Sequence, residues 1–457
     1  MIPCCIVSSL IRWSIKLSPE RKLPIESQPN ALPDEIDPEK YVIATYYFGA
    51  PIGLPIKDIC EMAAVEQSTG TWVLVPGETP QMRKKYVAKV IGIYEGPYPE
   101  YSQPKDVTHR HYIVQVAFPW VNFGQQIPML LSTVVGNISM GGRVKVLDLR
   151  FPKSWLKGFQ GPKFGTQGVF KVLGVKGRPL LNNMIKPCTG YPPEVGAKLL
   201  YEAARGGADI IKDDELIADP IFNRITDRLP LYMDAIDKAN SEKGEKTLYT
   251  INITDRIPKL MENAEAALEH GANALMINYL AVGYSAVRQV TDDPSINVPV
   301  LGHMDIAGAM SYSPISGLST QLVIGKLPRL AGIDIEVFPA PYGKAPLLKQ
   351  RYIEMARSMN YPLHHIKPTM PMPSGGITPG HVPMVVEDLG LEIMIGTGGG
   401  IHAFPAEHGG PSAGARAFRQ AIDATVKGIS LKDYAEDHPE LKVALDKWGT
   451  GKTGFEM

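Results

Sequence analysis

From Leu180 onward, a short apolar run followed by a helix-length segment recurs eight times over about 250 residues. The runs are Asn183–Lys186, Ala208–Lys212, Thr247–Ile253, Ala272–Tyr279, Val298–His303, Ile333–Phe338, His365–Pro373 and Glu392–Gly396. The clearest helices between and after them are Val195–Arg205, Arg256–Glu269, Leu347–Met359 and Ala413–Lys427. Regular alternation of strand and helix favours parallel strands, and eight such units predict a (β/α)₈ barrel.

Polar residues gather where these predicted strands end. They are Lys186, Lys212, Asp214, Glu215, Asn252, Thr254, Asn278, His303, Asp305, Ser374-Gly375-Gly376 and Gly398-Gly399-Gly400. Each one alone is ordinary turn chemistry. In a barrel, however, the carboxyl ends of all strands meet at one face, which is where barrel enzymes place their active sites.

The segment Gly206–Glu215 is the most specific of these strand ends. Side chains alternate along a strand, so Lys212 and Asp214 share a face, and Glu215 can join them where the strand ends. Clustered carboxylates need a cation, and all-oxygen ligation suits Mg²⁺. A protonated lysine is a poor ligand, but its amine becomes an oxygen ligand if CO₂ caps it as a carbamate. The alternative interpretation is a strand end followed by an acidic helix N-terminus.

Two further features fit a reaction centre on the same face. Backbone amides of the glycine runs at 375–376 and 398–400 can approach an anion closely, which favours a phosphate site. Lys186 lies in Ile-Lys-Pro-Cys-Thr-Gly, and a nearby Mg²⁺ would lower its pKa enough for proton transfer near neutrality. The competing interpretations are ordinary glycine turns and a surface lysine before a proline.

The residues before the barrel divide into three parts. Residues 1–37 are expected to be an extension and linker, either a loose extension or the result of a misassigned start, with no signal-peptide pattern. Residues 38–150 predict a small α+β domain, with strands at Tyr41–Phe48, Ser68–Val75, Tyr86–Tyr94 and His111–Pro119 and a helix at Pro55–Glu66. Residues 151–430 would form the barrel and 431–457 a helical tail.

Composition narrows the class of protein. The chain has 457 residues, with 47 Lys and Arg against 47 Asp and Glu, so it gives no support for a nucleic acid or membrane partner. Its four cysteines lack paired metal spacing and fit a reducing cytoplasm. No apolar stretch is long enough to predict a membrane span.

Taken in order, these motifs resemble the RuBisCO large-chain superfamily from about Tyr41 to Ile429. The matching segments are Glu66-Gln67-Ser68-Thr69-Gly70-Thr71-Trp72, Gly136-Asn137, Gly161-Pro162-Lys163-Phe164-Gly165, Ile185-Lys186-Pro187, Gly206–Glu215, Gly343-Lys344 and the two glycine runs. The resemblance implies a Mg²⁺ site of Asp214, Glu215 and Lys212 as N6-carboxylysine. It implies Lys186 or Lys344 as proton carrier.

The resemblance also implies where substrate and subunits meet. Asn137, His303, Ser374, Gly375, Gly376, Gly398, Gly399 and Gly400 would contact a phosphorylated substrate. Glu66, Thr71 and Trp72 would reach into a neighbouring subunit's active site. A homodimer or higher homo-oligomer is therefore expected.

Departures from the family pattern indicate the subfamily. Authentic carboxylases carry a second lysine where this chain has Cys188, a His-Arg pair where it has Asp305-Ile306, and a histidine where it has Val337. Isoleucine cannot replace the bidentate contact of arginine with a phosphate. The chain thus looks like a form IV, RuBisCO-like protein.

That subfamily implies a metal-stabilised enolate of a phosphorylated keto compound. A tautomerase, isomerase or carbon–carbon lyase would all use it, in sulfur or sugar salvage. The alternatives are a true ribulose-bisphosphate carboxylase and a non-catalytic sensor or scaffold barrel.

Overall fold

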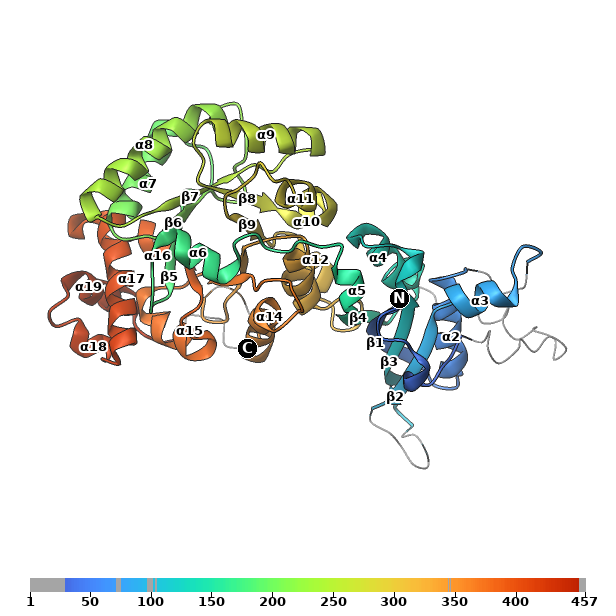
Figure 1. Ribbon diagram of the computed structural model, residues 1–457. Coiled ribbons are helices and arrows are strands. Elements are labelled where there is room, and N and C mark those ends of the chain that lie inside the picture. The colour runs from blue at the N-terminus through green and yellow to red at the C-terminus, as the bar shows by residue number, and fades with distance from the viewer. Residues whose placement is uncertain are drawn as a thin grey trace. The chain divides into compact units, whose positions relative to one another are not determined.

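The computed structural model describes residues 29–70, 75–96, 102, 105–343, 345 and 347–451. The chain forms two compact units (Figure 1). The first contains the residues up to Gly158 together with Met310–Leu322, and the second contains Phe159–Ala309 together with the residues from Val323 onward.

The first unit is built on a mixed five-stranded sheet. Its strands are β1 (Tyr41–Pro51), β2 (Lys89–Glu95), β3 (His109–Pro119), β4 (Val144–Arg150) and β10 (Gly317–Leu318), in the order β10-β4-β1-β3-β2. Every second residue of β1 is buried, as expected for a strand with one face on a core. All neighbouring strands are antiparallel except β10, which pairs in parallel with β4.

Helices α2 (Ile56–Glu66), α3 (Pro80–Tyr86) and α4 (Ile127–Val134) complete the first unit, together with short turns at Pro33–Glu35, Trp120–Asn122 and Asn137–Met140 and the four-residue α5 (Lys153–Leu156). The mixed α+β composition was predicted. A strand from Ser68 was wrong in its described part, because Ser68–Gly70 form the turn that ends α2. Ser68 Oγ donates to Ala64 O, and Gly70, at φ 74°, donates its N–H to Val65 O. Residues 71–74 lie outside the described part.

The second unit contains the predicted eight-stranded parallel barrel. Its strands are β5 (Leu180–Met184), β6 (Ile210–Lys212), β7 (Leu248–Asn252), β8 (Ala274–Asn278), β9 (Val300–His303), β11 (Ile335–Pro339), β12 (Met370–Ser374) and β13 (Met394–Thr397). All paired neighbours from β12 round to β13 are parallel. β12 and β13 also lie side by side, because a Cβ on Gly396 would come 3.1 Å from Ser374 Cβ.

Helices follow the strands as the alternating pattern predicted. They are α6 (Gly165–Leu173), α7 (Pro193–Arg205), α8 (Ile225–Lys243), α9 (Ile257–Glu269), α10 (Tyr279–Val282), α11 (Tyr284–Thr291), α12 (Ala307–Ser311), α13 (Leu327–Leu330), α14 (Lys349–Asn360), α15 (Val382–Leu389), α16 (Gly399–His402), α17 (Gly410–Lys427), α18 (Leu431–Tyr434) and α19 (Pro439–Trp448), with a π-helix at Gln321–Lys326 and short 3₁₀ helices at Pro379–His381 and Ala406–His408. None of these helices, within the described ranges, has an apolar stretch of the length needed to cross a bilayer.

The barrel interior is packed with side chains of one parity from each strand. Leu180, Ile210, Leu248, Met276, Leu301, Val337, Met372 and Met394 belong to this buried cluster. Because Ile210 faces the interior, Lys212 two residues later faces it too. The alternation of side chains along β6 therefore places Lys212 at the carboxyl-terminal end of the barrel interior.

Candidate active site

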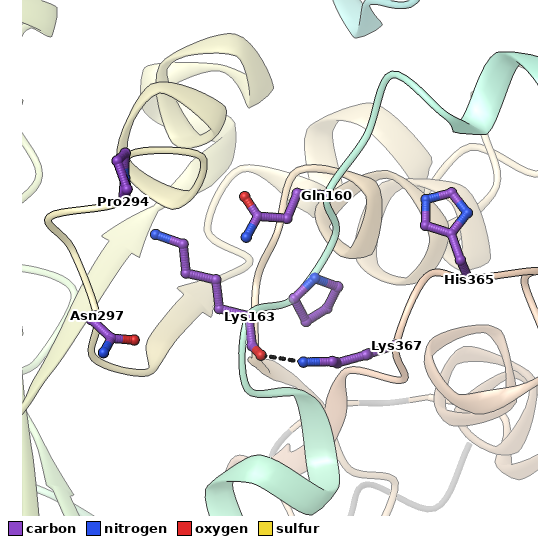
Figure 2. A pocket seen from close by; sticks show the side chains of 7 residues that line it. Gln160, Lys163, Pro294, Asn297, His365 and Lys367 are labelled. Atoms are coloured by element: carbon purple, nitrogen blue, oxygen red, sulfur yellow. Dashed lines mark hydrogen bonds between the residues drawn. The ribbon is translucent and has the colours of Figure 1, made fainter.

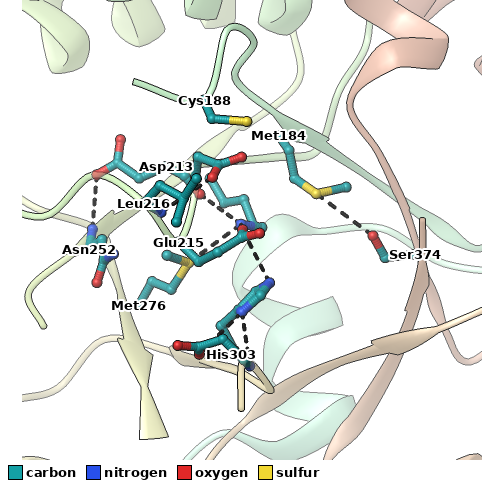
Figure 3. A network of polar contacts seen from close by, with 12 residues as sticks. Met184, Cys188, Asp213, Glu215, Leu216, Asn252, Met276, His303 and Ser374 are labelled. Atoms are coloured by element: carbon teal, nitrogen blue, oxygen red, sulfur yellow. Dashed lines mark hydrogen bonds and ion pairs between the residues drawn. The ribbon is translucent and has the colours of Figure 1, made fainter. Parts of the chain in front are cut away.

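Lys212 is a fully buried lysine at the end of β6, and Figure 3 shows the network of Glu215, Met276 and His303 to which it belongs. Its Nζ donates to Asp213 O at 2.7 Å and lies 3.4 Å from Glu215 Oε2 and 3.7 Å from Met276 Sδ. Burial disfavours the charged ammonium and lowers the pKa of Lys212, although the carboxylates of Glu215 and Asp214 act in the opposite direction. Burial therefore makes the neutral amine more accessible for Lys212 than for a lysine in solvent.

Asp214 is also buried, and its carboxylate meets Lys186. Lys186 Nζ lies 2.5 Å from Asp214 Oδ2 and 2.9 Å from Cys188 Sγ. Burial alone would lower the pKa of Lys186, but the hydrogen bonds and charges of Asp214 and Cys188 outweigh it and raise that pKa. The stem of Lys186 packs on Gly398, where an added Cβ would lie 2.9 Å from Lys186 Cε.

Glu215 reaches the same space from the turn after β6 and contacts His303. His303 Nε2 lies 3.2 Å from Glu215 Oε2, and the Asp305 N–H donates to His303 Nδ1 at 3.3 Å. His303 Nδ1 also lies 3.4 Å from Asp305 Oδ1, so the ring bridges the carboxylates of Glu215 and Asp305. Burial would raise the pKa of Glu215, but the charges of Lys212 and His303 lower it to about 2.

Asp213 points away from this group, into a buried cluster behind the barrel wall. It accepts from Arg228 Nη2 at 2.8 Å, Tyr249 Oη at 2.5 Å and the Asn252 N–H at 2.9 Å. Sequence reasoning missed Arg228 and Tyr249. The alternation indicated only that Asp213, directed away from Lys212 and Asp214, requires a partner of its own, and it did not indicate which residues supply that partner.

The two glycine turns follow the neighbouring strands β12 and β13. Gly375 and Gly376 have φ of 99° and 83°, a backbone region that L side chains rarely adopt. Gly343 approaches this turn so closely that a Cβ would lie 1.7 Å from Gly375 O. A Cβ on Gly400 would lie 2.7 Å from Ile377 O. Both turns therefore present backbone, not side chains, at the carboxyl-terminal face.

His402, at the end of α16, was also missed. Its ring Nε2 lies 3.0 Å from Asn183 Oδ1, while its Nδ1 is buried and has no hydrogen-bond partner among the described residues. Burial and the charge of Lys186 lower its pKa to about 4. A histidine two residues after Gly400 was the available signal. It supplies a neutral imidazole with an open acceptor close to the glycine turn.

Several predicted residues lie elsewhere. Glu66 and Asn137 belong to the first unit, where Asn137 Nδ2 donates to Glu66 Oε1 at 3.1 Å. The structure thus brings these two together, as expected of residues that act at one place. Thr71, Trp72 and Lys344 are outside the described residues, so their roles stay predictions.

The side chains around Lys212 fit a Mg²⁺ ion if Lys212 carries a carbamate. Among the described residues, no group of three His, Cys, Asp or Glu side chains is placed to hold a metal. Asp214 and Glu215 supply only two such carboxylates. A carbamate on Lys212 would provide the third anionic oxygen ligand, and the lowered pKa of this amine suits its formation.

Comparison with known proteins defines the class. The ribulose bisphosphate carboxylase large chain N-terminal domain matches residues 33–155, and the catalytic domain of the same large chain matches residues 165–448. The chain belongs to the ribulose bisphosphate carboxylase large-chain family.

The relatives identify the branch. A ribulose bisphosphate carboxylase-like protein of Archaeoglobus fulgidus is 59% identical over 92% of this chain and 96% of its own. A 2,3-diketo-5-methylthiopentyl-1-phosphate enolase of Geobacillus thermodenitrificans is 35% identical over 89% of this chain and 98% of its own. The chain is thus a RuBisCO-like member of the family, as its motifs predicted.

Solved structures share the fold over nearly the whole chain. A rubisco-like protein (MtnW) of Alicyclobacillus acidocaldarius has a TM-score of 0.81 at 34% identity, covering 90% of this chain and 100% of its own. A dimeric archaeal Rubisco of Hyperthermus butylicus has a TM-score of 0.83 at 33% identity, covering 93% of this chain and 100% of its own.

Proposed function

We propose that this RuBisCO-like enzyme enolises a phosphorylated α-diketone of the 2,3-diketo-5-methylthiopentyl-1-phosphate type. The observation that carries the proposal is the group of Lys212, Asp214 and Glu215 at the mouth of the barrel, with Lys212 fully buried. The name of the Geobacillus relative supports the substrate class.

Lys212 prepares the site by reacting with CO₂. Its neutral Nζ attacks the carbon, an N–C bond forms, and one amine proton leaves to solvent. The product carries a carbamate beside Asp214 and Glu215, which converts a cationic side chain into an anionic oxygen ligand. Mg²⁺ bound by these three residues would polarise a substrate carbonyl as a Lewis acid.

The remaining chemistry is proton transfer next to that carbonyl. Lys186 is the described lysine best placed for it, because its Nζ already lies at Asp214. With Asp214 engaged as a metal ligand, Lys186 would lose the ion pair that raises its pKa, and its amine would be a better base. Lys344 is the second candidate proton carrier.

The phosphate of the substrate would lie at the glycine turns, where Gly375, Gly376 and Gly398–Gly400 present backbone amides. Ser374 lies at the end of β12 beside them, and His303 lies at the end of β9, where it contacts Glu215. Neither Cys188 nor Ile306 can supply the second cationic phosphate contact that a bisphosphate requires. One phosphate and one metal-bound carbonyl are sufficient for enolisation.

Solvent-deuterium exchange tests this function most directly. The purified protein, with Mg²⁺ and bicarbonate in D₂O, is incubated with a panel of phosphorylated diketones and ketones. We expect deuterium at the carbon next to the carbonyl for the diketone class, with exchange abolished by EDTA. An absence of exchange across the panel, from protein that binds Mg²⁺, would contradict the proposal.

A further inference from the structure

A cavity lies at the opposite end of the barrel from Lys212. It has a volume of about 540 Å³ and is lined by Gln160, Pro162, Lys163, Pro294, Asn297, His365 and Lys367 (Figure 2). These residues come from three segments that precede α6, β9 and β12. They therefore lie at the amino-terminal ends of the strands, and we call this space the basal pocket.

The side chains that line the basal pocket are more positive than negative. Among the described residues that line it, two are lysines, one is a histidine and none carries a carboxylate. The closest acid in sequence, Asp293, uses its carboxylate on the Ser295 N–H and hydroxyl at 2.8 and 2.7 Å. Both lysines donate to backbone carbonyls, and the nearby carboxylates, chiefly Asp293 and Asp334, act on them by charge without a direct ion pair.

Several N–H donors in the basal pocket have no hydrogen-bond acceptor among the described residues. Lys163 Nζ donates to Asp293 O and to Ile296 O, the latter at 2.7 Å, and keeps one N–H. Lys367 Nζ donates only to Lys163 O, at 2.5 Å, and keeps two. The amide groups of Gln160 and Asn297 bond to nothing in the described part of the chain and add further donors.

The walls of the basal pocket are fixed by buried contacts behind them. Asp334 accepts the N–H groups of Phe164, Gly165 and Val300 at 2.7, 2.8 and 3.0 Å, joining the first segment to the second. His365 Nε2 bonds Phe159 O at 3.0 Å and joins the third segment to the first. The donors are therefore held in place before any ligand arrives.

We propose that the basal pocket binds a small multivalent phosphorylated anion at a site separate from the reaction centre. Two lysines that form no ion pair among the described residues favour a ligand with more than one negative charge, and lysine ammonium groups and amide N–H groups are common phosphate donors. The volume lies in the range of small-molecule sites, large enough for a nucleotide-sized ligand.

Pyrophosphate is the probe, and isothermal titration calorimetry on the full chain gives its affinity. Lys367→Gln removes an open ammonium group, and Asn297→Asp places a carboxylate on an exposed wall that makes no internal bond. We expect each change to weaken pyrophosphate binding about tenfold, the loss of one charged hydrogen bond. Gln81→Glu, an exposed amide-to-carboxylate change on α3, is the control and should leave the affinity unchanged.

Lys186→Gln separates the basal pocket from the glycine turns, which also attract phosphate. Binding that weakens in Lys186→Gln but not in Lys367→Gln or Asn297→Asp would overturn the proposal, as would no binding at millimolar pyrophosphate. Citrate is the carboxylate comparison. Citrate binding as tight as pyrophosphate binding would overturn the assignment to phosphorylated ligands.

Discussion

Asp213 and Asp214 are consecutive in the chain, yet their carboxylates serve opposite sides of the barrel wall. Asp213 pairs with buried Arg228 behind the wall at 2.8 Å, and Asp214 pairs with Lys186 in the mouth at 2.5 Å. The first pair fixes the end of β6, and the second lies in the proposed reaction centre. One dipeptide therefore links the stability of the barrel to the geometry of its site.

The Asp213–Arg228 pair should be essential for folding. Both side chains are fully buried, so Arg228→Met leaves Asp213 charged and without its ion-pair partner. We expect the free energy of unfolding in urea to fall by about 3–5 kcal/mol. Asp213→Asn added to this variant should recover part of the loss. A change below about 1 kcal/mol would contradict this account.

Lys212→Met tests the carbamate. Methionine fills a similar volume without a charge, so we expect the variant to unfold at the same temperature as the parent or higher. Mg²⁺-dependent deuterium exchange should fall by more than about 100-fold, since even indirect support of a metal is worth 10–100-fold. The carbonyl signal of a carbamate in ¹³CO₂-loaded protein should also vanish.

Lys198→Met on the exposed side of α7 is the matched control, and it should keep both the carbamate signal and the exchange. Full Mg²⁺-dependent exchange in Lys212→Met would rule out the proposed role of this lysine.

His402 should make stability depend on pH. Burial lowers its pKa from 6.5 to about 4, so between these values the unfolded chain binds a proton that the folded protein does not. Stability is therefore retained above pH 6.5 and lost as pH falls toward 4, by up to about 3 kcal/mol.

His402→Gln can keep the donor to Asn183 while removing the titration. We expect the variant to lose less stability than the parent between pH 7 and pH 4.5 in urea titrations. Equal slopes for the two proteins, or a His402 ring that titrates near pH 6.5 by NMR, would show the pKa shift to be wrong.

Carboxylation of ribulose bisphosphate should be negligible. Asp305 and Ile306 stand where a carboxylase has cationic phosphate contacts, and Ile306 is 52% exposed with φ of 73°. Losing two charged hydrogen bonds costs about 10²- to 10⁴-fold. Labelled bicarbonate should give no labelled phosphoglycerate over many turnovers, with an authentic archaeal Rubisco as the positive control. Stoichiometric labelling of phosphoglycerate would show that the protein is a functional carboxylase and would contradict this prediction.

The active form should be a homodimer or larger. Glu66 and Asn137 form a pair in the first unit, where the family pattern expects residues that complete a neighbour's site. Asn137→Ala and Lys212→Met should each be inactive alone. Refolded together, they should recover about a quarter of the activity, because half the dimers carry one intact site. No recovery, or a fully active monomer by sedimentation, would contradict this.

The barrel and its lysine were predictable from the sequence because period-two alternation is a local property. Leu180, Ile210 and Leu248 mark the interior parity, and the same parity places Lys212 beside Asp214 on one face. The structure places Glu215 with them, as the turn after β6 suggested. The roles of these residues as ligands stay predictions.

Other features left no local signal. Helix α8 carries Pro230 within its length, although a proline inside a helix removes a backbone hydrogen bond and usually kinks or ends the helix. Arg228 reaches Asp213 across fifteen residues with no periodic relation. The basal pocket draws on three loops that meet only after the strands have closed.

The parallel pairing of β10 with β4 gives the first unit an unusual dependence on chain order. Lys145 in β4 donates to Ser311 O and Ser313 O, beside a strand formed by Gly317 and Leu318. During synthesis, the edge of β4 stays unpaired until most of the barrel has been made, which takes on the order of tens of seconds at about 5–20 residues per second. A ribosome-bound intermediate therefore carries an unpaired strand edge, and chaperones that shield such edges should associate with it before residue 318 emerges.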